Sequence, residues 1–217
     1  ATLSRVTVTG GVSGGIVVSP GESPSIEECT IDGNSGPGVR CCEGASPSLK
    51  ACTIARNSSG GVHCAEGSSP SLTSCTIAGN SGDFDVGGGV NCIRSSPTLT
   101  SCTISRNSGG PRLVAGLYCL EGSSPSLTAC TISENSGSGV SCDGSSPSLT
   151  ECTISGNQGS GVFCGKSSSP RLADCTILAN GGLGGVHCDE GSSPTLTDCR
   201  ISENWFGVWC AGSSPIL

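Results

Sequence analysis

The stretch SSPSLTECTISGNQGSGVFC, residues 145–164, recurs with small changes from one end of the chain to the other. In each repeat a cysteine precedes a Thr-Ile pair, which is Arg-Ile in the last repeat. Successive cysteines of this kind are mostly 22–24 residues apart, with two longer steps. A period of 20–50 residues is typical of a solenoid, in which each unit buries its apolar face only against its neighbours. Because the repeat runs unbroken, we expect a single elongated domain over residues 1–217. The repeated cysteines are Cys29, Cys52, Cys75, Cys102, Cys130, Cys152, Cys175 and Cys199.

Three short runs within each repeat alternate with period two, which predicts strands. In the quoted repeat, Pro147 and Leu149 share one face of the first run, and Val162 and Cys164 share one face of the third. Turn residues separate the runs, and no helical periodicity interrupts them. The sequence therefore predicts an all-β fold, a parallel β-helix with three strands in each of about nine turns.

The inward positions carry the same small residues in every turn, so each turn should stack like on like. Only 3% of the residues are aromatic and none is Met, as a narrow coil requires. A Gly precedes the Val of each third strand, where we expect the missing Cβ to permit a sharp bend. These glycines are Gly38, Gly61, Gly89, Gly116, Gly139, Gly161, Gly185 and Gly207.

An Asn column marks the second corner of each repeat: Asn34, Asn57, Asn80, Asn107, Asn135, Asn157, Asn180 and Asn204. Over essentially the whole chain, the repeats resemble the right-handed parallel β-helix repeats of the pectate-lyase-like superfamily. The resemblance implies right-handedness and an asparagine ladder, in which each side chain bonds to its neighbours in adjacent turns. It implies a fold rather than an activity, because function depends on sites grafted onto a fold.

Composition excludes some partners. The net charge of −7 and the lack of a Lys/Arg stripe argue against nucleic-acid binding. No apolar run approaches the ~20 residues of a membrane span. The chain shows no initiator Met and no signal peptide, so we expect Ala1 to be a processed or trimmed start. Secretion is one such process, and we expect a location outside the cell or on its surface.

Two inward columns account for sixteen of the seventeen cysteines. Without Cys-x-x-Cys pairs they do not predict a metal site, and we expect no cofactor. A disulfide framework remains open, since stacked Cα atoms ~4.8 Å apart are within bonding range. We favour small buried thiols, because parallel side chains do not offer the ~90° disulfide dihedral. Cys42 follows an inward Cys, so it should face outward, where it could link chains.

The outward position of the third strand varies strongly where the rest of the repeat does not. It holds Arg40, His63, Asn91, Tyr118, Ser141, Phe163, His187 and Trp209. Aromatic faces flanked by polar groups suit sugar rings or a protein partner. Two adjacent repeats also carry longer second corners, and repeat insertions often lie on the binding side of a solenoid. We therefore predict a binding site formed by Asp83, Phe84, Asp85, Asn91, Arg112 and Tyr118.

Carboxylates bear on catalysis. Glycoside hydrolysis needs two carboxyls ~5–10 Å apart. Glu151, Asp174 and Asp198 should stack at the first corner, either as solvated acids or around a cation such as calcium. Asp83 and Asp85 form a second cluster. The superfamily resemblance implies polysaccharide lyases and hydrolases, which cluster acids with basic residues, but neither cluster here has basic partners. We predict no catalytic residues and a non-enzymatic structural or interaction solenoid, with polysaccharide binding or cleavage as the alternative.

Outward Thr residues on the second strands, with Ser or Thr on the first, form hydroxyl ladders that resemble the faces of β-solenoid ice-binding proteins. Thr also simply suits exposed strand positions. We keep ice binding as a distant alternative.

The two ends of the chain both stop in the slot of the first strand. Ala1-Thr2-Leu3 and Pro215-Ile216-Leu217 occupy it, and neither looks like a capping turn. Head-to-tail stacking into a filament is one interpretation, with Trp205, Phe206 and Trp209 near the junction. An excerpt from a longer solenoid is the other.

Overall fold

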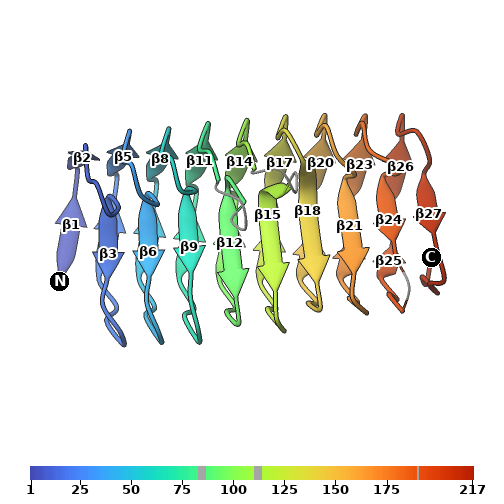
Figure 1. Ribbon diagram of the computed structural model, residues 1–217, viewed down its shortest axis with the longest axis horizontal. Coiled ribbons are helices and arrows are strands. Elements are labelled where there is room, and N and C mark those ends of the chain that lie inside the picture. The colour runs from blue at the N-terminus through green and yellow to red at the C-terminus, as the bar shows by residue number, and fades with distance from the viewer. Residues whose placement is uncertain (83–86, 110–113, 190) are drawn as a thin grey trace.

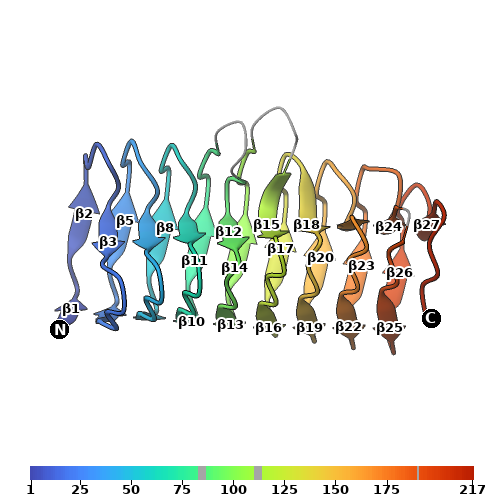
Figure 2. The same cartoon turned by 60° about the horizontal axis from the view of Figure 1, so that its bottom comes forward.

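The computed structural model describes residues 1–82, 87–109, 114–189 and 191–217, except for the side chains of Val114 and Ala115. Within these ranges the chain forms strands and turns and no helix. The chain winds into a rod with its two termini at opposite ends (Figure 1; Figure 2). The predicted all-β parallel β-helix is confirmed.

Three parallel sheets of nine strands run along the rod. The first sheet contains β1 (Thr2–Ser4), β4 (Ser25–Glu27), β7 (Ser48–Lys50), β10 (Ser71–Thr73), β13 (Thr98–Thr100), β16 (Ser126–Thr128), β19 (Ser148–Thr150), β22 (Arg171–Ala173) and β25 (Thr195–Thr197). The second contains β2 (Thr7–Thr9), β5 (Thr30–Asp32), β8 (Thr53–Ala55), β11 (Thr76–Ala78), β14 (Thr103–Ser105), β17 (Thr131–Ser133), β20 (Thr153–Ser155), β23 (Thr176–Leu178) and β26 (Arg200–Ser202). The third contains β3 (Ile16–Val18), β6 (Val39–Cys41), β9 (Val62–Cys64), β12 (Val90–Ile93), β15 (Val114–Leu120), β18 (Ser138–Asp143), β21 (Val162–Gly165), β24 (Val186–Cys188) and β27 (Val208–Cys210).

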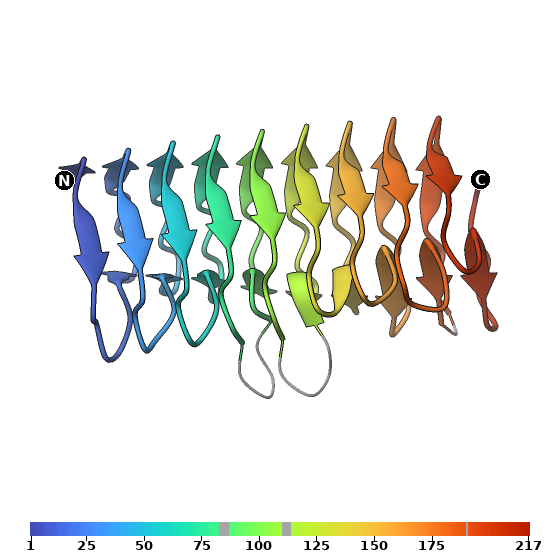
Figure 3. The same cartoon turned by 90° about the horizontal axis from the view of Figure 1, so that it is seen from above.

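Each strand pairs with the strand one turn away, in the register that the repeat predicts (Figure 3). Leu72 lies opposite Leu99, and Ile77 lies opposite Ile104. Adjacent turns are therefore ~4.8 Å apart, the spacing of paired strands. The first corner joins the first sheet to the second, and the second corner joins the second sheet to the third. The third corner leads on to the next turn.

The degenerate first turn and the final segment keep this register. Val8 pairs with Ile31, and Val18 occupies the cysteine position opposite Cys41. At the other end, Ile216 bridges to Thr195 of β25, in the slot of a further first-sheet strand.

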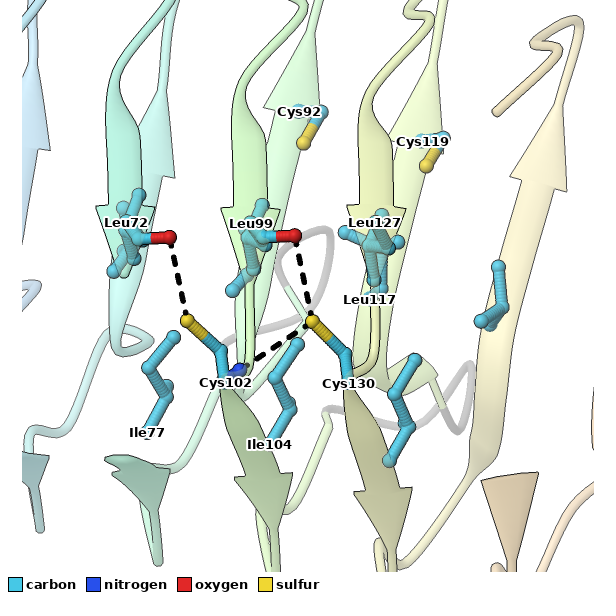
Figure 4. Packing of buried hydrophobic residues seen from close by; sticks show 14 of the residues in the cluster. Leu72, Ile77, Cys92, Leu99, Cys102, Ile104, Leu117, Cys119, Leu127 and Cys130 are labelled. Atoms are coloured by element: carbon cyan, nitrogen blue, oxygen red, sulfur yellow. Dashed lines mark hydrogen bonds between the residues drawn. The ribbon is translucent and has the colours of Figure 1, made fainter. Parts of the chain in front are cut away.

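The core is a stack of thin apolar layers, and its Leu, Ile, Val and Cys columns are buried along nearly the whole rod. Figure 4 shows part of it. Each thiol of the column at the first corner also donates a hydrogen bond back to the preceding turn. Cys102 Sγ reaches Leu72 O at 3.5 Å, and Cys130 Sγ reaches Leu99 O at 3.5 Å. These cysteines therefore combine apolar packing with a weak hydrogen bond to a carbonyl of the first-sheet strand one turn before.

The glycine at the start of the third strands is required by crowding in every turn but the last, where a Cβ on Gly207 would meet only Ile201 Cγ2 at 3.9 Å. The crowding, rather than the expected sharp bend, accounts for the column. A Cβ on Gly139 would lie 2.7 Å from Ile154 Cγ2 and 2.8 Å from the carbonyl oxygen of Gly161. The φ angle of Gly139 is not in the left-handed region. The glycine column thus lets the second corner of one turn pack onto the next.

The asparagine ladder implied by the superfamily resemblance is present. Asn57 Oδ1 accepts hydrogen bonds from the backbone N–H and from Nδ2 of Asn34, at 3.1 and 2.8 Å. Asn57 Nδ2 donates to Ile31 O at 3.1 Å and to Asn80 Oδ1 at 2.9 Å. The side-chain chain continues to Asn204. The asparagine ladder satisfies buried backbone groups at a corner where the hydrogen bonds between paired strands are interrupted.

We predict that Asn57→Ala lowers the free energy of unfolding by about 3 kcal/mol, because it removes four hydrogen bonds and leaves buried polar groups of Asn34 unpaired. Urea denaturation followed by circular dichroism measures the change. Ser58→Ala is the matched control, because Ser58 is the next residue and its side chain is exposed. Equal midpoints for the two variants would show that the ladder contributes no stability.

All seventeen cysteines are free thiols in the structure. Burial raises the pKa of Cys119, so that thiol stays protonated and protected from reagent in the folded protein. After denaturation without reductant, we expect all seventeen thiols to react with a thiol reagent in a colorimetric count. A count of one would mean eight disulfides and would refute the thiol columns.

Candidate functional site: a groove on the third sheet

The outward column of the third sheet forms a continuous stripe along the rod. Tyr118 pairs in register with Ser141, Ser141 with Phe163, and Phe163 with His187. The strands β15, β18, β21 and β24 that carry them lie side by side (Figure 1). Side chains that the repeat separates by some twenty residues therefore become direct neighbours on one face, at ~4.8 Å per turn.

This stripe is the floor of an open groove of about 500 Å³, which we call the C-terminal groove. The second corner forms one wall, with Ser138, Ser160 and Leu183, and the third corner forms the other. The third-corner wall carries Asp143, Gly165, Lys166 and Asp189. Aromatic rings thus lie along the floor, with hydroxyl groups on the second-corner side and charged groups on the third-corner side.

Phe163 is held in place by its neighbours. Its ring meets the ring of His187 edge-on, with centroids 5.1 Å apart and an interplanar angle of 79°. A Cβ on Gly165 would lie 3.1 Å from Phe163 Cε1, so the glycine leaves room for the ring above the strand end. The half-buried phenyl ring therefore presents a fixed surface to the groove.

The carboxylates on the third-corner wall each lie against a basic side chain. Lys166 Nζ lies 2.6 Å from Asp143 Oδ2, across one turn. His187 Nε2 lies 3.2 Å from Asp189 Oδ1. Each carboxylate thus has a basic partner, and the groove offers both hydrogen-bond donors and acceptors to a ligand.

The structure brings together two of the six predicted binding residues. Asn91 of β12 pairs in register with Tyr118 of β15. Tyr118 lines the groove, whereas Asn91 is buried and its amide bonds to the backbone of Gly87, with Oδ1 accepting at 2.6 Å and Nδ2 donating at 2.7 Å. Asn91 therefore anchors the end of a long second corner. Asp83, Phe84, Asp85 and Arg112 lie outside the described residues.

The predicted assembly residues lie apart from the groove. Trp205 and Phe206 are exposed on the last turn, and Phe206 packs against Trp209 with ring centroids 5.0 Å apart. Trp209 continues the third-sheet stripe beside His187. Cys42 is partly exposed at the third corner, as its position after an inward cysteine predicted.

The acidic column at the first corner is exposed. Glu151, Asp174 and Asp198 occupy equivalent corner positions with left-handed backbones, at φ of 54°, 53° and 52°. Within the described ranges, no three His, Cys, Asp or Glu side chains converge as they would around a metal ion. In the same part of the chain, no helix has the length and apolarity that a membrane crossing requires.

Sequence reasoning missed the third-corner wall of the groove. Asp143 and Asp189 follow the second cysteine of their repeats, and Lys166 lies two residues after it. Like the outward stripe, these positions vary from repeat to repeat, and that variation was the available signal. Their contacts cross a turn boundary, so they become visible only once the register is known.

The sequence matches the right-handed β-helix region family over residues 1–113 and 112–217, which together span the whole chain.

The chain belongs to this family.

Solved structures support the same fold for this β-helix. The superposition on pectate lyase Pel9A covers 95% of this chain and 69% of the lyase, with a TM-score of 0.59 and 10% sequence identity. Weaker likenesses include the tailspike protein gp49 from Pseudomonas phage LKA1, with a TM-score of 0.42, 12% identity and coverage of 95% and 46%. Another is the A-module of the mannuronan C-5 epimerase AlgE6 of Azotobacter vinelandii, with a TM-score of 0.42, 12% identity and coverage of 100% and 83%. A sequence comparison with curated proteins gives no match.

Proposed function

We propose that this β-helix is a non-enzymatic interaction protein that binds a saccharide chain in the C-terminal groove. The observation that carries the proposal is the aromatic stripe of Tyr118, Phe163 and His187, flanked along both sides by polar groups. Sugar rings present apolar faces and hydroxyl edges, so they match aromatic surfaces with hydrogen-bonding groups beside them.

The shape of the groove favours a chain over a single sugar. Its floor spans the four neighbouring strands β15, β18, β21 and β24, so it runs along the rod. Successive floor side chains repeat at ~4.8 Å. A polymer lying along the rod would place successive units over successive turns.

The charged wall supports binding without cleavage. Hydrolysis by general acid–base catalysis needs two carboxyls at a separation set by the mechanism, with one of them protonated. Here Asp143 is bonded to Lys166 at 2.6 Å, and Asp189 lies against His187 at 3.2 Å. Paired in this way, the four groups act as fixed donors and acceptors for sugar hydroxyls.

Cleavage is the competing function, because the same wall collects two carboxylates, a lysine and a histidine. A panel of neutral and acidic polysaccharides, scored for binding and for release of new chain ends, distinguishes the two. We expect binding to at least one polysaccharide and no new ends. New chain ends that disappear in Asp143→Asn would establish an enzyme and overturn the non-enzymatic assignment.

We predict that Phe163→Ala weakens saccharide binding about tenfold, because it removes the central ring of the floor, worth ~1.4 kcal/mol of contact. Isothermal titration calorimetry with the best ligand of the panel measures the change. Trp205→Ala is the control, because Trp205 is an exposed aromatic residue outside the groove lining. Unchanged affinity in Phe163→Ala, or equal losses in both variants, would place the site elsewhere.

A further inference from the structure

A second groove lies on the third sheet near the start of the rod, over β6 and β9 and the second corners that precede β3, β6 and β9. These three strands lie side by side near the N-terminal end (Figure 1). Its volume is about 430 Å³, and we call it the N-terminal groove. Arg40 and His63 form its floor and pair in register across one turn. Ser13, Ser35 and Ser59 line the second-corner side, with Val12 and Pro37.

Elsewhere along the rod, basic and acidic side chains of neighbouring turns form ion pairs. Arg5 pairs with Glu28 at 2.7 Å, and Arg106 pairs with Glu134 at 2.7 Å. The same holds for Arg56 with Asp32, for Arg94 with Glu66 and Glu121, and for Lys166 with Asp143. Acids outnumber basic residues by 17 to 10 in this chain, so partners are plentiful.

The Arg40–His63 pair departs from this pattern. Among the described residues, no carboxylate pairs with Arg40, and its neighbours in register are Val17 and His63. Beyond His63 lies Asn91, which is neutral. Three other basic residues also form no ion pair in the described structure. Lys50 faces Glu27 in register, so it has an acidic neighbour. Arg171 and Arg200 lie on the first and second sheets, with no second basic residue beside them in register. Among the described residues, the Arg40 guanidinium thus has a basic side chain and no carboxylate beside it in register.

We propose that the N-terminal groove binds an oxyanion of a ligand, a carboxylate or a sulfate group, between Arg40 and His63. A planar guanidinium donates two parallel hydrogen bonds to such a group. The imidazole on the next turn supplies a further donor, and the Ser13 and Ser35 hydroxyls lie along the same side. The exposed side chain of Val12 offers an apolar edge for the carbon frame of the ligand.

His63 reports on the bound anion. Burial, and then the charge of Arg40, lower its pKa, so in the empty groove the imidazole loses its proton readily. An anion between the two residues would stabilise the imidazolium and raise the pKa. The protein carries an internal reference for the titration of His63, because His187 in the C-terminal groove is the only other histidine in the sequence.

The test is an NMR pH titration of the two imidazole signals in sodium sulfate, sodium acetate and sodium chloride at equal ionic strength. We expect sulfate or acetate to raise the pKa of His63 by about half a unit or more relative to chloride, with His187 unchanged. An effect of sulfate alone indicates a sulfated ligand, and an effect of acetate alone indicates a carboxylate. Equal His63 values in all three salts would overturn the proposal, as would equal shifts of both histidines.

Two variants show whether Arg40 holds the anion. In Arg40→Gln, the difference between sulfate or acetate and chloride should vanish, while in Arg200→Gln it should persist. Arg200 is an exposed arginine on a strand of the second sheet, and its replacement changes the net charge equally. Arg40→Gln should also raise the His63 pKa in chloride, because a neighbouring cation is removed. An anion effect that survives in Arg40→Gln would refute the site. The proposal is independent of saccharide binding in the C-terminal groove.

Discussion

The constraint on which the rest of this structure depends is the stacking of one second corner on the next. The Asn side chain of each turn accepts two N–H groups of the preceding turn, as Asn57 does for Asn34. A few residues later the chain passes so close to the adjacent turn that a Cβ on Gly139 would overlap Ile154. Both positions therefore admit one residue type, and together they fix where the second and third sheets meet.

Uniform corners allow the outward surface to vary. The ladder continues from Asn80 to Asn107 although the intervening second corner is longer than usual, because the extra residues follow the Asn without displacing it. The core columns likewise stay constant while the third-sheet stripe changes from arginine to tyrosine to phenylalanine. Both grooves lie on this stripe, whose side chains differ from turn to turn while the core columns and the ladder do not. Such a division between a constant scaffold and a variable face is how solenoids acquire binding surfaces.

The repeat was sufficient to predict the strands, their register and the buried columns, because each depends on residues at fixed positions within one turn. The ladder was implied by the resemblance to the pectate-lyase-like superfamily. Contacts between turns were harder to predict. The role of Gly139 as a contact with the next turn, rather than a bend, needed the spacing between Ile154 and the corner. The paired amide of Asn91 depends on where Gly87 returns to the strand. The Lys166–Asp143 pair joins corners of different repeats, so no single repeat contains the signal.

The stacking also determines how charge is distributed on the third sheet. In a parallel in-register stack, equivalent side chains are ~4.8 Å apart, so a charge interacts mainly with the turns before and after it. In the C-terminal groove, Lys166 meets Asp143 and His187 meets Asp189, so each carboxylate of the wall has a basic side chain beside it. In the N-terminal groove, Arg40 and His63 adjoin without an acid between them. One face of the rod thus offers an aromatic surface whose carboxylates are paired and, in other turns, a separate surface where the Arg40 guanidinium has no carboxylate pair among the described residues.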